Sequence, residues 1–129
     1  MPKICVIQFN VSDMDAAIDF YCSKLGFSIK GKEYYPDIVL LDHEGPSVLL
    51  YKVDKPFKID YPNVAQTLVN IQVDDLRKVM ADLKAKGVEF IHDKPQPCPA
   101  GIYAAIRDPS GNVHELLEFG GSVDDQGTS

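Results

Sequence analysis

The sequence predicts an α+β fold made of two repeated βαβββ modules, and three observations support this. First, the order strand, helix, strand, strand, strand can be read twice, over residues 3–53 and 67–119. Second, each expected helix ends at a glycine, Gly26 in one module and Gly87 in the other. Third, a glycine-containing turn precedes the last strand of each module. Such a duplication indicates that one architectural unit is used twice.

The duplication also sets the expected domain boundaries. We expect a single domain over residues 1–119, with a linker over residues 54–66 between the two modules. Residues 120–129 are polar and rich in Gly, Asp and Ser, and are therefore expected to form a frayed tail.

The first module begins with an alternating strand in which Ile7, Phe9 and Val11 share one face. Ser12 is expected to be the N-cap of the following helix. The apolar stripe of that helix consists of Met14, Ala17, Ile18, Tyr21 and Leu25. The strands of this module are expected over residues 3–11, 27–30, 37–42 and 47–53.

The second module repeats this pattern after the linker. Asp74 is expected to cap its helix, and Asp108 opens the tight turn that ends at Gly111. The apolar stripe of the helix consists of Leu76, Val79, Met80 and Leu83. The strands are expected over residues 67–73, 88–91, 102–107 and 113–119, and a proline-rich loop over residues 92–101.

A constant offset relates the two modules residue by residue. An offset of 62 maps Gln8 to Asn70, and it maps the other first-strand residues in the same way. After the longer loop of the second module the offset becomes 66, which maps Leu49 to Glu115. Glu115 is thus an acid within a largely apolar strand, at the position of a leucine in the first module.

The sheet faces opposite the helices predict a binding site. If a pseudo-twofold axis relates the modules, these faces turn toward a shared crevice of apolar walls with a few polar groups, as in small-molecule pockets. The crevice would be lined by Val6, Gln8, Asn10, Leu49, Leu68, Asn70, Gln72 and Glu115. In the alternative interpretation, the amide side chains are simply solvated on an open sheet.

Composition excludes several other functions. The net charge of −6 argues against a nucleic-acid partner, because phosphate binding requires a basic patch. No apolar run is long enough to span a membrane, and the first residues do not resemble a signal peptide, so a cytoplasmic location is expected. Three cysteines without close pairs argue against a disulfide framework or a zinc knuckle.

Two segments resemble the vicinal oxygen chelate superfamily, which includes glyoxalase I, fosfomycin- and bleomycin-resistance proteins, and extradiol dioxygenases. The segment VSDMDAAIDFYCSKLGF (residues 11–27) is similar to the first helix and following strand of that family. The segment IRDPSGNVHEL (residues 106–116) is similar to its terminal hairpin. The resemblance implies a fold of paired βαβββ modules, and it implies a homodimer, because members of the family often complete their pocket with residues of two chains.

The resemblance also implies where a metal would bind. Metal-using members place four ligands, usually His and Glu, at four equivalent strand positions. Here these positions hold Val6, Leu49, Leu68 and Glu115. Three of them are aliphatic and offer no donor atom, so we predict no metal and no other cofactor, with a divalent metal as the less favoured alternative. The three histidines lie outside this set.

Glu115 is therefore the central candidate residue. In a dry crevice its charged form would be disfavoured and its pKa raised, which suits a general acid or base, or an anchor for a ligand amine. Alternatively, Glu115 is a structural group hydrogen-bonded to Gln8 or Asn70. Tyr51, Tyr103 and Arg107 are further candidate ligand-binding residues, because their side chains are expected near this face.

These residues support three functions. The favoured one is a metal-independent protein that sequesters a small apolar or aromatic compound. The second is a glyoxalase-type lyase or isomerase, or a dioxygenase, with Glu115 as base or ligand. The third is a structural or regulatory module with a collapsed cavity.

Overall fold

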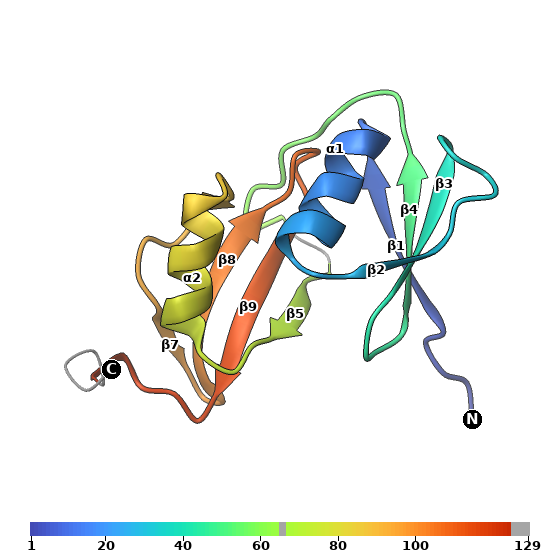
Figure 1. Cartoon of the computed structure of the whole chain (residues 1–129). Coiled ribbons are helices and arrows are strands. Elements are labelled where there is room, and N and C mark those ends of the chain that lie inside the picture. The colour runs from blue at the N-terminus through green and yellow to red at the C-terminus, as the bar shows by residue number, and fades with distance from the viewer. Residues whose placement is uncertain (65–66, 125–129) are drawn as a thin grey trace. The chain divides into compact units, whose positions relative to one another are not determined.

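The computed structural model describes residues 1–64 and 67–124, and these residues form two compact units with one sheet each (Figure 1). The first unit consists of Met1–Lys58 together with the turn Pro109–Asn112. The second consists of Ile59–Asp108 and the described residues from Val113 onward. The mixed α+β fold class predicted from the sequence is confirmed.

The sheet of the first unit has the strand order β1-β4-β3-β2. Its strands are β1 (Val6–Val11), β2 (Ser28–Gly31), β3 (Ile38–Asp42) and β4 (Ser47–Lys52). β1 runs parallel to β4, and the other two pairs are antiparallel. Phe9 and Val11 are buried together with alternate residues of β3 and β4, as their alternation with polar residues predicts.

The helix of the first unit changes its winding along its length. α1 (Met14–Ile18) continues into a π-helical segment, Asp19–Lys24, in which the Leu25 N–H reaches back five residues to the Phe20 carbonyl at 3.0 Å. Phe20 and Tyr21 are both buried, with their rings edge to face and the centroids 4.9 Å apart. The expected stripe did not include Phe20, although Phe20 lies three residues after Ala17 and so falls on the same helical face.

The second unit has the strand order β5-β9-β8-β6, with the short strand β7 also paired to β8. Its elements are β5 (Val69–Gln72), α2 (Leu76–Ala85), β6 (Glu89–Phe90), β7 (Gln96–Cys98), β8 (Gly101–Arg107) and β9 (Val113–Phe119). The expected loop over residues 92–101 therefore contains a strand. α2 contacts β8 and β9 and buries Leu76, Met80 and Leu83.

The strand register confirms the repeat. Gln8 lies opposite Leu49 between the parallel strands β1 and β4, and Asn70 lies opposite Glu115 between the parallel strands β5 and β9. These are the pairs that the offsets of 62 and 66 relate. The crevice predicted between the two modules stays a prediction.

The helix caps differ from expectation by one residue. Asp13, rather than Ser12, caps α1 by accepting the Ala16 N–H at 3.1 Å. Asp75, rather than Asp74, caps α2 by accepting the Lys78 N–H at 3.2 Å. A carboxylate can accept from the third residue after it only where its own backbone is extended, as it is at both aspartates.

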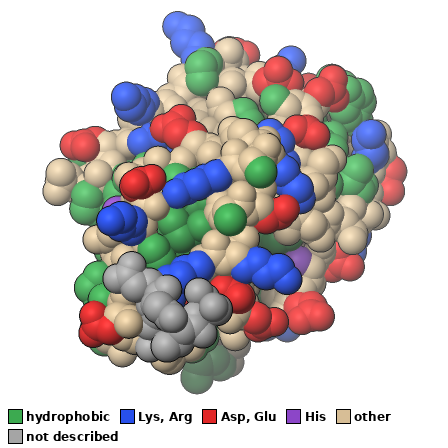
Figure 2. Space-filling model, turned by 60° about the vertical axis from the view of Figure 1, so that its left-hand side comes forward, with side chains coloured by type: hydrophobic (Ala, Val, Ile, Leu, Met, Phe, Trp, Pro, Cys, Tyr) green, Lys and Arg blue, Asp and Glu red, His purple; other side chains and the backbone are tan. Residues whose placement is uncertain are grey.

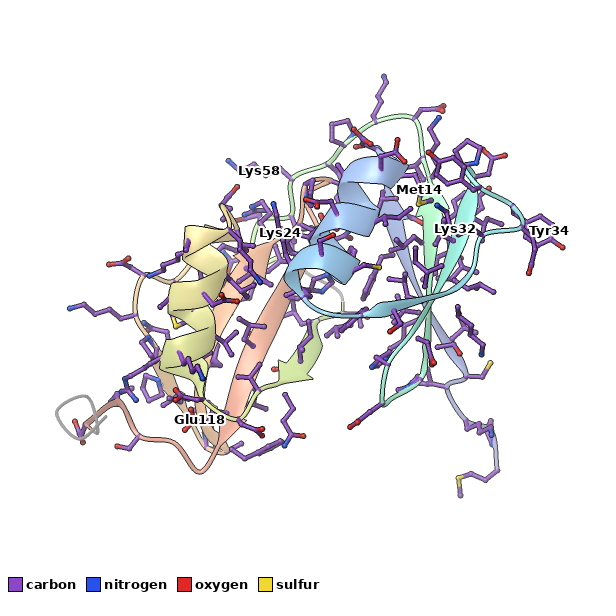
Figure 3. All side chains as sticks on the ribbon, in the orientation of Figure 1. Met14, Lys24, Lys32, Tyr34, Lys58 and Glu118 are labelled. Atoms are coloured by element: carbon purple, nitrogen blue, oxygen red, sulfur yellow. The ribbon has the colours of Figure 1, made fainter. Side chains whose placement is uncertain are left out.

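The chain after β9 is tied to the beginning of α2. The Arg77 guanidinium donates to the carbonyls of Ser122 and Val123 at 3.0 and 3.3 Å. Glu118 accepts the Leu76 N–H at 2.8 Å and lies at this end of α2 in Figure 3. Two residues of the expected tail, Ser122 and Val123, are thus hydrogen-bonded to α2. Its last residues, 125–129, and linker residues 65–66 lie outside the described residues. Within the described chain no helix combines the length and apolarity that crossing a membrane requires.

Candidate functional site: an acid bonded to one of three packed aromatic rings

Glu115 lies on β9, between β5 and β8 in the sheet of the second unit. Its neighbours in register are Asn70 on β5 and Ala105 on β8. His114 and Leu116 on either side of it are buried, whereas Glu115 itself is half-buried. Glu115 thus points to the sheet face opposite the buried one, as the alternation of β9 predicts.

Tyr61 is the partner of Glu115. Its hydroxyl donates to Glu115 Oε2 at 2.5 Å. Burial, followed by the hydrogen bond and the negative charge of Glu115, raises the pKa of Tyr61 well above its usual value, so the hydroxyl keeps its proton. Gln8, which the sequence offered as a partner for Glu115, donates instead to Asn10 Oδ1 at 2.9 Å.

His92 stands between two tyrosine rings. Its centroid is 5.6 Å from that of Tyr61 and 5.4 Å from that of Tyr103, and the ring planes cross at 79° and 88°. Edge-to-face contacts of this kind hold aromatic rings in fixed orientations. We call Tyr61, His92, Tyr103 and Glu115 the acid–aromatic cluster; all four side chains are half-buried.

The protonation state of His92 follows from its contacts. The Ala105 N–H donates to His92 Nδ1 at 3.0 Å, so this nitrogen must be an acceptor and the ring proton lies on Nε2. Burial lowers the pKa of His92, and the charge of Glu115 opposes this shift only in part. His92 is therefore a neutral imidazole at neutral pH.

Arg107 supports the segment that carries Tyr61. Its guanidinium donates to the Ile59 carbonyl at 3.3 Å and to Glu89 Oε2 on β6 at 3.1 Å. The Ile59 carbonyl lies two residues before Tyr61, and Glu89 lies on the neighbouring strand. Arg107 therefore links the segment that carries Tyr61 to the sheet. This arrangement makes it a positioning residue for the cluster.

The other predicted site residues divide between the two units. In the first unit Val6, Gln8 and Asn10 share the open sheet face with Leu49 and Tyr51, and Val6 and Tyr51 are 45% and 43% exposed. In the second unit Asn70 is exposed on β5. Leu68 is half-buried and precedes β5, although the expected strand included it. Of the predicted residues, the structure brings Glu115 and Tyr103 together, through His92.

Sequence analysis missed Tyr61 and His92. Tyr61 falls in the linker, to which no function was assigned, and no periodic pattern marks it. His92 was set aside as a loop residue. Strand pairing could have indicated it, because Glu89 pairs with Arg107 and the antiparallel register then brings the chain after Phe90 alongside Ala105, the neighbour of Glu115.

The four positions that correspond to metal ligands do not fit a metal. Val6, Leu49 and Leu68 have no donor atoms, and one oxygen of Glu115 is already hydrogen-bonded to Tyr61. Within residues 1–64 and 67–124, no three His, Cys, Asp or Glu side chains gather in a way that could hold an ion. The cluster offers instead aromatic surface, one carboxylate and one neutral imidazole.

Known proteins share this sequence pattern and this fold. An uncharacterised protein of Shewanella frigidimarina is 30% identical over 127 residues, which cover 91% of this chain and 93% of the relative. A glyoxalase family protein from Enterococcus faecalis has a crystal structure with a TM-score of 0.74 and 25% identity, covering 92% of this chain and 98% of that one. TnmS3, an antibiotic-binding protein from Streptomyces sp. CB03234, has a TM-score of 0.68 and 26% identity, covering 92% and 97%.

The family assignment rests on most of the chain. The sequence model described as "Glyoxalase/Bleomycin resistance protein/Dioxygenase superfamily" matches residues 3–116, which include both modules and Glu115. The resemblance seen in residues 11–27 and 106–116 is therefore confirmed, and this chain belongs to the glyoxalase/bleomycin resistance protein/dioxygenase superfamily.

Proposed function

We propose that this protein binds and sequesters a small apolar or aromatic compound without using a metal ion. The observation that carries the proposal is the acid–aromatic cluster, in which Tyr61 is hydrogen-bonded to the carboxylate of Glu115 and its ring packs against His92, which in turn packs against Tyr103. Aromatic walls with a few fixed polar groups are typical of small-molecule sites.

The donor set supports binding over metal chemistry. At three of the four ligand positions the side chain is aliphatic, so a divalent ion would have one carboxylate and water as its ligands. The antibiotic-binding neighbour TnmS3 has the same fold at 26% identity, which is consistent with a binding role on this scaffold.

The alternative function is a lyase, isomerase or dioxygenase in which Glu115 acts as a base. The hydrogen bond from Tyr61 disfavours this role, because a carboxylate that already accepts a phenolic O–H is less available to take a proton from a substrate. In addition, Leu49 and Leu68 occupy two of the metal-ligand positions, so they could not hold the metal ion that such enzymes of the family use. A homodimer, a cytoplasmic location and the absence of a nucleic-acid partner stay predictions.

The test uses N-phenyl-1-naphthylamine, a neutral aromatic compound that fluoresces when it enters an apolar site. With EDTA present, we expect saturable binding at one molecule per chain, unchanged when Ni²⁺, Zn²⁺ or Mn²⁺ replaces EDTA. Tyr103→Ala should weaken binding about fivefold, because one aromatic contact contributes about 1 kcal/mol. Tyr34→Ala, which removes a tyrosine that is 66% exposed in the first unit, is the matched control.

Two results would contradict the proposal. One is the absence of saturable binding in EDTA, or binding that appears only with a metal. The other is turnover of a glutathione hemithioacetal by the metal-loaded protein that Glu115→Gln abolishes, which would establish the lyase alternative.

A further inference from the structure

We propose that the acid–aromatic cluster selects an organic cation, an ammonium or similar group attached to an apolar or aromatic body. This inference rests on the proposed function and names the class of compound that the site prefers. It follows from the charges of the four side chains, the orientation of the three rings and the distribution of the other charged residues.

The cluster carries one negative charge, and neither Tyr61 nor His92 offsets that charge. Tyr61 binds the carboxylate as a neutral O–H donor. His92 has its Nδ1 engaged as an acceptor by the Ala105 N–H, so it stays a neutral imidazole beside the acid. The nearest cation on the neighbouring strand, Arg107, is held by Glu89 and the Ile59 carbonyl. A cationic ligand would therefore meet a carboxylate whose cluster partners are uncharged.

The rings provide the second element of cation recognition. The His92 plane crosses those of Tyr61 and Tyr103 at 79° and 88°, so each tyrosine ring meets His92 edge to face. The face of an aromatic ring carries partial negative charge and attracts an ammonium within about 6 Å of its centre. Several aromatic rings gathered at one site are also what the aromatic cages that bind quaternary ammonium groups use.

The charges on the rest of the surface indicate that the preference for a cation arises at the cluster and not from the protein as a whole. The chain has a net charge of −6, which favours the approach of cations in general. On the face shown in Figure 2, however, Lys and Arg side chains stand among Asp and Glu side chains. Because the fields of interspersed opposite charges largely cancel, the charge preference should come from Glu115 itself. An anionic ligand would be repelled by the same carboxylate.

The test compares two probes of the same shape, phenyltrimethylammonium and tert-butylbenzene, which differ in charge. Binding is measured by ligand-observed NMR at pH 7.5 in EDTA. We expect the cation to bind at least about tenfold more tightly than the neutral probe. Glu115→Gln should reduce this preference to less than about threefold, because the glutamine oxygen still accepts from Tyr61 but carries no charge.

Asp82→Asn is the matched control, since it makes the same change in net charge on α2, where Asp82 forms an exposed pair with Lys86 at 3.2 Å. It should leave the preference for the cation unchanged. Loss of preference in both variants, or in neither, would overturn the assignment to Glu115.

The remaining outcomes separate this inference from the proposed function. Equal binding of the two probes, or tighter binding of tert-butylbenzene, would overturn the cation preference and leave the proposed function standing. Binding of neither probe would contradict both. If circular dichroism shows that Glu115→Gln does not fold, the preference of the unmodified protein between the two probes decides the cation preference alone.

Discussion

The two copies of the repeat, residues 3–53 and 67–119, share their strand order and register, but among the residues that the structure describes the acid–aromatic cluster forms at the open sheet face of the second copy. Gln8 pairs with Leu49 in the first copy as Asn70 pairs with Glu115 in the second. In the second copy the linker contributes Tyr61 and the segment after β6 contributes His92. The comparison teaches that the duplicated strands supply equivalent positions, and that the unequal connections between them supply the site.

The largest difference that we expect concerns the repeat-related turn glycines, Gly45 and Gly111. A Cβ at Gly111, where φ is +105°, would overlap the Phe57 carbonyl, whereas a Cβ at Gly45 would have the side-chain ring of His43, and not the backbone, as its nearest neighbour, at 2.6 Å. Gly111→Ala should lower the free energy of unfolding by at least about 3 kcal/mol, through strain and overlap together. Gly45→Ala should cost less than about 1 kcal/mol. Urea unfolding of both variants measures the difference, and similar costs would contradict it.

The second difference concerns Val48 and His114, which occupy repeat-related buried positions. Burial lowers the pKa of His114 to about 4, and the charge of Asp108 only partly opposes this. In the unfolded chain the His114 imidazole takes up a proton below about pH 6.5, whereas in the folded protein it stays neutral down to about pH 4. Folding is therefore not opposed by this group above pH 6.5, and protonation of the unfolded chain lowers the free energy of unfolding as the pH falls from 6.5 to about 4. The free energy of unfolding should decrease over that interval by on the order of 3 kcal/mol from this group.

His114→Val makes the second copy like the first at this position and removes the titrating group. Urea unfolding measured at several pH values should show a flatter profile for the variant between pH 6.5 and 4. An unchanged slope in His114→Val would assign the acid sensitivity to other groups.

The smallest effect concerns the helix caps, where the copies behave alike. Asp13→Ala and Asp75→Ala should each lower the free energy of unfolding by about 1 kcal/mol, because each leaves an N–H of the first helical turn without its acceptor. Asp74→Ala is the control for α2, since Asp75 is the cap, and should change stability by less than about 0.5 kcal/mol. Thermal unfolding of the three variants would refute the assignment if Asp74→Ala proved the most costly.

Much of the fold could be predicted, because its signals are local. The alternation around Phe9, the stripe of α2 and the turn before β9 depend on residues close in sequence, and all three are confirmed. The caps were predicted one residue too early, because the sequence offers two adjacent polar residues at each helix start and only the backbone conformation distinguishes them. The π-helical turn was missed, because Phe20 and Tyr21 lie three and four residues after the buried Ala17, a spacing that an ordinary α-helix satisfies equally well.

The candidate site could be predicted only in part, because its contacts join distant segments. Glu115 was identified from alternation within β9 alone, and Tyr103 from its place on the neighbouring strand. Tyr61 and Glu115 are 54 positions apart, and no period or motif relates a linker tyrosine to a strand carboxylate.

The sequence by itself determined the duplicated βαβββ architecture, the family, and the single carboxylate among aliphatic residues at the four ligand positions. These features depend on periodicity, short motifs and residue identity, which can be read from residues close together in the sequence. Only the tertiary structure decided that Tyr61 donates to Glu115 and that His92 lies between two tyrosine rings as a neutral imidazole. The physical reason is that hydrogen bonds and ring contacts between distant segments form only once strand pairing has fixed where the connecting segments pass.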